Sequence, residues 1–206
     1  MSSFPTTSTA LLETLAGIDT GVDQAAWCRF FERYQPVMVE FARAKGAGDD
    51  AEDVVQEVFA DLVKVFREGK YVRERGRFRS YLAAMLRNEL VGRFRRMKAR
   101  PEGAAADVSA EEALAAALPA AERTPSVPRE ADDERAWRLA NHRVAVNHVL
   151  TKTALSEQSR RIYRELLETG ESCAEVARRL GIPAATVRQV KSRVSRMIVA
   201  YEKAVT

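Results

Sequence analysis

The sequence predicts an all-α protein, because three observations agree along its whole length. Apolar residues recur at three- and four-residue steps, which is the period of a helix with one buried face. The breaks between these segments carry glycines that end helices and Ser or Asp residues that begin them. No stretch sustains the two-residue alternation of a strand. We therefore expect two small helical domains joined by a flexible linker, the C-terminal one containing a helix-turn-helix.

The N-terminal domain is predicted over residues 23–100, after a Ser/Thr-rich flexible extension over residues 1–22 with at most a short helix at 10–16. Its first helix spans 24–44 and carries aromatic and aliphatic residues on one face, with Pro36 as a candidate kink. The chain Lys45-Gly46 ends this helix with a basic residue and a glycine.

A second helix is predicted to start at Asp49 or Asp50 and to run to about Phe66. Four acidic residues crowd its first turn, where the helix macrodipole favours negative charge. A basic loop at 71–76 then leads into a long helix from 78 to 98, which completes the domain.

Residues 101–133 are predicted to be an acidic, Ala/Pro-rich linker with at most a transient helix at 111–118. As a coil, the stretch has a root-mean-square span of ~30 Å. The segment 101–136 carries 9 acidic and 3 basic residues, so it is a poor ligand for DNA.

The C-terminal domain is predicted over residues 134–206 and contains four helices. The first covers about 134–151, and the second follows the N-cap Ser156 and ends near Gly170. Ser172-x-x-Glu175 is a capping box that opens a third helix ending at Leu180-Gly181, and Pro183 opens a fourth that runs to about 203.

The distribution of charge and the positions of the cysteines indicate which ligands the protein is suited to bind. Residues 1–100 hold 17 basic and 14 acidic side chains, and residues 137–206 hold 13 and 6, so an acidic segment separates two basic modules suited to polyanions. Cys28 and Cys173 form no C-x-x-C, and His142 and His148 have no cysteine at zinc-ligand spacing. We expect a cytoplasmic chain with no metal, no cofactor, no signal peptide and no membrane partner.

The sharpest local motif is the predicted helix-turn-helix at residues 171–197. Gly181-Ile182-Pro183 supplies a tight turn, and Ala177 is small enough to let the two helices cross closely. The outer face of the second helix carries donor-rich side chains suited to phosphates and base edges. The candidate DNA contacts are Thr186, Arg188, Gln189, Lys191, Ser192, Arg193 and Arg196.

Acidic residues at 50, 53 and 57 stand three and four apart, so they form a stripe on one side of the second helix. Capping and ordinary surface charge are one explanation for them. Paired carboxylates also suggest acid–base catalysis, but no nucleophile, His partner or glycine-rich phosphate loop accompanies them. We therefore expect no enzymatic activity.

The segment Asp50-Ala51-Glu52-Asp53-Val54-Val55-Gln56-Glu57-Val58-Phe59 resembles the polymerase-binding helix of sigma-70-family factors, specifically the extracytoplasmic-function (ECF) group. The family pattern is Asp-Ala-Glu-Asp-hydrophobic-x-Gln-Glu-x-Phe. The resemblance implies docking on the largest catalytic subunit of RNA polymerase through four polar contacts, with two apolar residues on the core side. These residues are Asp50, Asp53, Gln56 and Glu57, and Val54 and Phe59.

Two further segments resemble the same family. Residues 76–82 look like the part that engages melted promoter DNA, and Arg87-Asn88 with 93–96 look like the minus-ten reader, although Gly92 stands where members often have an acid. Residues 67–100 hold 12 basic and 3 acidic side chains. Aromatic rings among them can be core residues or can stack unpaired bases, at about 1–3 kcal/mol per base. The implied DNA contacts are Arg73, Arg75, Arg77, Phe78, Arg79, Tyr81, Arg87, Asn88, Arg93, Arg95 and Arg96.

The resemblance implies a sigma factor that reads an upstream minus-thirty-five element with its helix-turn-helix and captures the melted minus-ten strand. Its expected partners are core RNA polymerase, through the largest catalytic subunit and the flap-bearing subunit, and promoter DNA in duplex and single-stranded form. An anti-sigma factor is a further candidate partner. The alternatives are a conventional helix-turn-helix regulator that binds duplex DNA without polymerase, usually as a dimer, and an RNA-binding protein that uses the basic helix.

Overall fold

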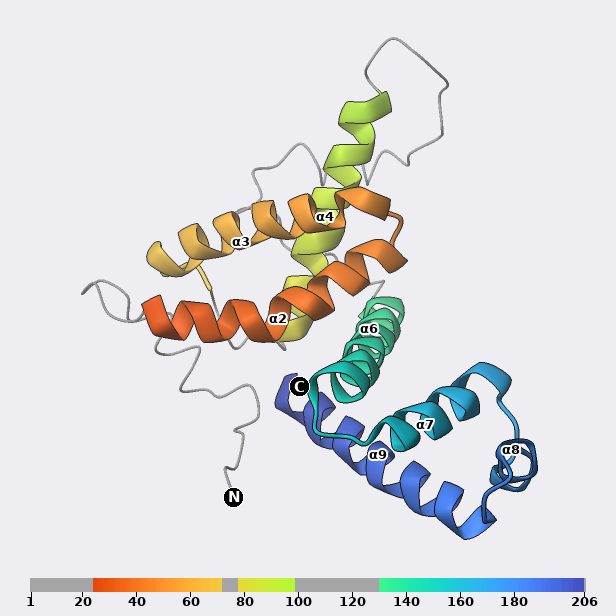
Figure 1. Ribbon diagram of the computed structural model, residues 1–206. Coiled ribbons are helices and arrows are strands. Elements are labelled where there is room, and N and C mark those ends of the chain that lie inside the picture. The colour runs from red at the N-terminus through yellow and green to blue at the C-terminus, as the bar shows by residue number, and fades with distance from the viewer. Residues whose placement is uncertain (1–23, 72–77, 99–129, 206) are drawn as a thin grey trace. The chain divides into compact units, whose positions relative to one another are not determined.

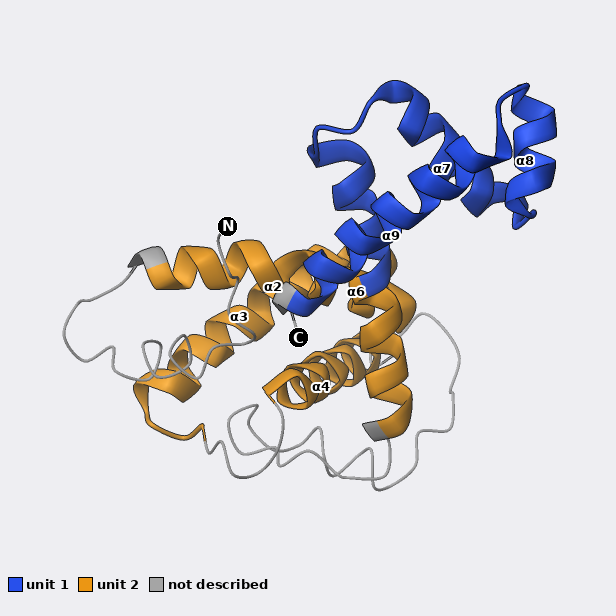
Figure 2. Cartoon of the chain, turned by 90° about the horizontal axis from the view of Figure 1, so that it is seen from below, with its two compact units in different colours: residues 1–6, 142–206 blue, residues 7–141 orange. Residues whose placement is uncertain are grey.

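The structure is a computed structural model that describes residues 24–71, 78–98 and 130–205 (Figure 1). These residues form seven α-helices and one 3-10 helix, with no strand among them, so the all-α prediction is confirmed. The chain divides into two compact units (Figure 2). Unit 1 is residues 1–6 and 142–206, and unit 2 is residues 7–141.

Unit 2 is built on three helices. They are α2 (Gln24–Ala44), α3 (Ala51–Arg67), which follows the 3-10 helix η2 (Gly48–Asp50), and α4 (Phe78–Lys98). Their bounds agree with the predicted helices to within a residue or two. Figure 1 shows α2 beside α3, with α4 crossing behind both, and all three helices contact one another.

Aromatic rings fill the centre of unit 2. The Phe30 ring lies 5.8 Å from Phe59 and 5.7 Å from Phe78, measured between ring centroids, and Phe78 meets Tyr34 edge-on at 5.8 Å. Edge-to-face pairs at such separations add to the free energy gained from burying the rings. Helices α2, α3 and α4 each contribute to this cluster, which fixes them against one another.

The next helix, α6 (Glu130–Lys152), begins four residues before its predicted start at 134. Residues 130–133, expected to be linker, are therefore helical. The boundary between the units falls inside α6, because residues 130–141 group with unit 2. Trp137 is buried there, with its ring 5.8 Å from the ring of Phe41. The extension 1–22 and the linker segment 101–129 lie outside the described residues.

Unit 1 holds the remainder of α6 and the helices α7 (Glu157–Thr169), α8 (Cys173–Leu180) and α9 (Ala184–Val205). Its core is mainly aliphatic, with Ile162, Val176, Val187 and Val194 almost fully buried. The predicted N-cap of α7 is confirmed, because the Ser156 side chain accepts a hydrogen bond from the Ser159 backbone N–H at 3.3 Å. None of the described helices has the length and apolar composition needed to cross a membrane.

Candidate functional site

The acidic stripe, formed by Asp50 at the end of η2 and by Asp53 and Glu57 of α3, lies on the surface of unit 2. The side chains of Asp50, Asp53 and Glu57 are 48%, 73% and 50% exposed, and Gln56 is exposed beside them. The apolar residues that the sequence placed on the core side, Val54 and Phe59, are 0% and 1% exposed. One helix therefore presents carboxylates to solvent while its opposite side anchors it in the core.

Arg93 of α4 forms ion pairs with all three carboxylates of this stripe. Its Nε lies 3.2 Å from Asp50 Oδ2, and its terminal nitrogens lie 3.7 Å from carboxylate oxygens of Asp53 and Glu57. The sequence predicted Arg93 as a DNA contact, but the structure directs its guanidinium toward α3. Three carboxylates outweigh one cation, so the stripe keeps a negative charge while its side chains are held in place.

Glu89 of α4 lies next to Glu57 of this stripe with its side chain only 13% exposed, and it was not predicted as a site residue. Arg96, another expected DNA contact, lies 2.6 Å from Glu89 Oε1 and 3.9 Å from Glu57. Burial raises the pKa of Glu89, the neighbouring Glu57 raises this pKa further, and Arg96 opposes both effects. The available signal in the sequence was that Glu89 is the one acidic residue among the many arginines of α4.

Two other expected DNA contacts, Arg79 and Arg87, lie against the opening of α6. Arg79 Nη2 is 2.8 Å from Glu134 Oε1, and Arg87 forms an ion pair with Asp133. Lys45 Nζ lies 2.9 Å from the other oxygen of Asp133. The acidic run at 132–134 was visible in the sequence, but its partners 46 to 88 residues away were not.

The predicted stacking role of Phe78 requires a correction. Phe78 is 6% exposed and lies among the rings of the unit 2 core, so it is a core residue. Tyr81 is partly buried with its ring 5.5 Å from Tyr71, and burial, Tyr71 and Asp61 raise its pKa, so its hydroxyl stays protonated. Phe94 is 41% exposed.

The remaining expected contacts of this region divide into two groups. Asn88 and Arg95 are partly buried on α4. The basic residues of the loop, Arg73, Arg75 and Arg77, lie outside the described residues.

In unit 1, α8 and α9 are joined by three residues. Gly181 has φ +64°, a left-handed conformation that favours glycine, and Ile182 N–H donates to Ala177 O at 3.1 Å. Ala177 and Val187 are buried between the two helices. The local geometry is therefore that of two short-linked helices packed through small and branched side chains.

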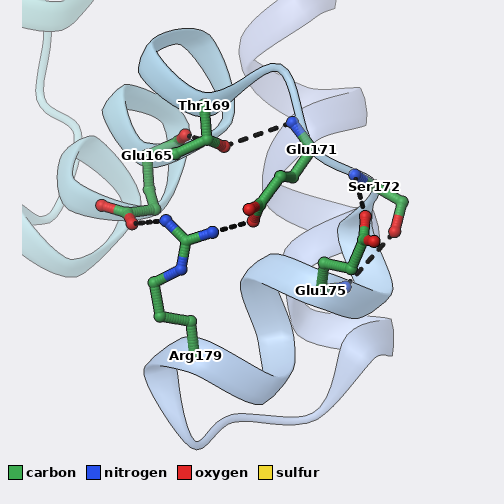
Figure 3. A network of polar contacts seen from close by, with 6 residues as sticks. All are labelled: Glu165, Thr169, Glu171, Ser172, Glu175 and Arg179. Atoms are coloured by element: carbon green, nitrogen blue, oxygen red, sulfur yellow. Dashed lines mark hydrogen bonds and ion pairs between the residues drawn. The ribbon is translucent and has the colours of Figure 1, made fainter.

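A polar network fixes the connection between α7 and α8 (Figure 3). Ser172 and Glu175 form the predicted capping box, with Ser172 N–H donating to Glu175 Oε2 at 2.9 Å and Glu175 N–H donating to Ser172 Oγ at 3.3 Å. Hydrogen bonding of the Glu175 carboxylate with the side chain and then with the backbone N–H of Ser172 lowers the pKa of Glu175. Arg179 bridges Glu165, at 2.7 Å, and Glu171. The N-terminal end of α8 is therefore fixed by the capping box, and Arg179 ties the same helix to α7 and to the α7–α8 connection.

The outer face of α9 exposes the side chains of Arg188, Gln189 and Lys191. Within the part of the chain that the structure describes, neither Arg188 nor Lys191 forms an ion pair. Arg193 instead donates to Ser159 Oγ at 2.7 Å, across to the start of α7.

The other predicted contacts of α9 are Thr186, Ser192 and Arg196. Thr186 is partly buried, Ser192 is exposed, and the exposed Arg196 donates from Nε to the backbone oxygen of Ser192 at 3.4 Å. Exposed donors therefore extend along α9 from Arg188 to Arg196. Among the described residues, no group of three or more His, Cys, Asp or Glu side chains could hold a metal ion.

Comparison with known families gives one match in each unit. Residues 30–100, which contain most of α2 and all of α3 and α4, match the family model described as Sigma-70 region 2. Residues 158–196, from α7 to the middle of α9, match the model described as CENP-B N-terminal DNA-binding domain. Searches of curated proteins and of solved structures found no match to the chain.

Proposed function

We propose that this chain, whose residues 30–100 match the Sigma-70 region 2 model, is an ECF-type sigma factor that binds core RNA polymerase and directs promoter-specific transcription initiation. The observation that carries the proposal is the coincidence of two facts. The region 2 match covers α3, and the residues of α3 that the family resemblance assigns to polymerase are the exposed ones. A sigma factor of this kind contributes binding surfaces and no catalytic group.

The polymerase contact is proposed for Asp50, Asp53, Gln56 and Glu57. A row of carboxylates favours a basic partner surface, and long-range attraction between such surfaces speeds association. The partner expected from the resemblance is the largest catalytic subunit. Arg93 positions the carboxylates, so a preformed surface meets polymerase at a smaller entropic cost.

DNA binding is proposed for both units. The open donors Arg188, Gln189 and Lys191 on α9 suit the major groove of an upstream duplex element. The match of residues 158–196 to a DNA-binding domain supports this role in coarse terms. In unit 2, Arg79, Arg87 and the basic loop are proposed to hold the melted strand. Two weak contacts on one chain bind more tightly together than either does alone.

The deciding experiment is promoter-specific transcription by core polymerase with and without the chain. Asp53→Arg with Gln56→Ala should abolish co-purification with core polymerase while the circular dichroism spectrum stays unchanged, because both side chains are exposed. The control is Glu32→Arg, which makes the same charge change at an exposed position of α2. Undiminished polymerase binding by the double variant would remove the docking assignment.

A conventional duplex-binding regulator is the second candidate, and the match of unit 1 to a DNA-binding domain of another family favours it. Such a regulator would bind paired half-sites as a dimer without polymerase. Sedimentation of the chain with duplex DNA tests this alternative, because a sigma factor is expected to act as one copy per polymerase.

A further inference from the structure

The first three turns of α6, which belong to unit 2, contact α2 and α4 and bury an acidic residue. Asp133 is 5% exposed and lies between two cations, Lys45 at 2.9 Å and Arg87. Glu134 follows it and pairs with Arg79 at 2.8 Å. The side chains of Arg79 and Arg87 are each 15% exposed, so these pairs are better shielded from water than ordinary surface ion pairs.

Apolar packing accompanies the ion pairs. Trp137, one turn beyond Asp133, is 3% exposed and meets the Phe41 ring, and Ala140 is 2% exposed. Lys45 Nζ lies 5.4 Å from the centroid of the same Phe41 ring. One side of α6 therefore carries both charged and apolar contacts to the rest of unit 2, at the spacing of successive helical turns.

The cations covered by α6 are those that the proposed function gives to the melted strand. A guanidinium binds a carboxylate and a phosphate through the same planar array of N–H donors. Glu134 and Asp133 each lie against one terminal nitrogen of Arg79 and Arg87, and both arginine side chains are only 15% exposed. A DNA phosphate therefore competes with these carboxylates for the two guanidinium groups.

We propose that residues 130–141 of α6 inhibit strand binding from within the chain, with Asp133 and Glu134 standing in for DNA phosphates on Arg87 and Arg79. The inference rests on the proposed role of α4 in DNA capture. In the free chain the acidic opening of α6 covers these arginines, and it leaves them when a strand binds. A sigma factor built in this way binds single strands weakly until polymerase holds its parts in the transcribing arrangement.

The test compares two neutralising changes in the full chain. Asp133→Asn with Glu134→Gln removes the covering charges, whereas Asp132→Asn removes a charge from the exposed neighbouring residue of the same helix. The probe is a fluorescein-labelled single-stranded deoxyoligonucleotide, followed by anisotropy. We expect the double variant to bind about 10-fold more tightly than the wild type, the factor for a covered state that holds about 90% of the free chain. Asp132→Asn should bind as the wild type does.

A further substitution separates uncovering from a general loss of negative charge. Adding Arg87→Ala to the double variant should cancel the gain, because the uncovered guanidinium makes the new contact. A gain that survives Arg87→Ala, or an equal gain with Asp132→Asn, overturns the inference. Hydrogen exchange at the amides of 131–141 should also speed up when the oligonucleotide binds, and unchanged exchange contradicts the displacement.

Further variants test the proposed function independently of the proposed inhibition. If Arg79→Ala and Arg87→Ala leave promoter-specific transcription by the polymerase complex unchanged, the role of α4 in DNA capture is wrong and the inhibition loses its target. If these variants impair transcription while the Asp133–Glu134 variant binds single strands no better than Asp132→Asn, the proposed function stands and the inhibition is overturned.

Discussion

The cations expected to bind DNA differ between the two units in whether they form ion pairs. In unit 2, Arg79, Arg87, Arg93 and Arg96 all form ion pairs with carboxylates of the same unit. In unit 1, Arg188 and Lys191 at the start of α9 have no such partner among the described residues. A basic composition alone would predict the same behaviour for both. The difference teaches that net charge locates a polyanion-binding module, whereas pairing decides whether its cations are available.

The cores differ as well, and this difference predicts the largest effect. Phe30 is fully buried among several rings of unit 2, and Ile162 is buried in the aliphatic core of unit 1. Phe30→Ala should cost about 3–5 kcal/mol and Ile162→Ala about 2–5 kcal/mol of unfolding free energy. Hydrogen exchange during denaturant titration measures each unit separately. Equal destabilisation of both units by Phe30→Ala would argue that they unfold together.

A second prediction concerns the open and covered cations directly. Arg188→Ala should weaken binding of the free chain to an upstream promoter duplex by roughly 1–3 kcal/mol, the value for a lost bidentate base contact. Arg87→Ala should leave binding of the free chain to single strands nearly unchanged, since Asp133 already occupies this guanidinium. Electrophoretic mobility shifts with both probes measure these effects. A large loss with Arg87→Ala in the free chain would show that this cation is open.

Replacing two glycines by alanine should change the free energy of unfolding in opposite directions. Gly181 has φ +64°, so Gly181→Ala should destabilise unit 1 by about 1–2 kcal/mol. Gly92 lies inside α4, and an added Cβ there meets nothing within 4 Å, so Gly92→Ala should stabilise unit 2 by about 0.4–1 kcal/mol. Thermal melts of both variants check the pair. Stabilisation by Gly181→Ala would contradict the turn geometry of α8 and α9.

The smallest predicted effect is a dependence on pH that differs between the units. The pKa of Glu89 is raised above its ordinary 4.5, so its contribution to stability is present below that pH and is lost as pH rises through the raised value. The pKa of Glu175 is lowered, so its contribution is present above 4.5 and is lost as pH falls through the lowered value. Denaturant midpoints against pH measure both effects.

Neutral variants assign these two slopes to their residues. Glu89→Gln should flatten the dependence above pH 4.5 in unit 2, and Glu175→Gln should flatten the dependence below it in unit 1. Slopes that the substitutions leave intact would place the titrating groups elsewhere.

Local features of the sequence predicted the helices well. The acidic first turn of α3, the capping box at Ser172 and the glycine at 181 act within one or two turns, so their effects are visible in a short window. The exposed carboxylates of α3 also followed from the helical period. These signals depend on neighbours along the chain and not on tertiary contacts.

Contacts between distant residues were not predictable from the same signals. The partners of Arg93 and Arg87 lie on other helices, and a basic residue in a basic helix looks the same whether it is open or paired. Phe78 was expected to stack bases because it stands among arginines, but the packing of α2 and α3 places it in the core. Asp133 and Trp137, near the early start of α6, are buried beside Lys45 and Phe41, which lie far from them in the sequence.

Both tryptophans of the chain, Trp27 and Trp137, lie in unit 2. Because the Trp137 indole is buried beside Phe41, its fluorescence should be blue-shifted while α6 stays in place and should move to longer wavelengths when water reaches the ring. Unit 1 contributes no indole emission. Trp137 is therefore an intrinsic fluorescence probe for the position of α6. A Trp27→Phe variant would leave it as the single tryptophan that emits.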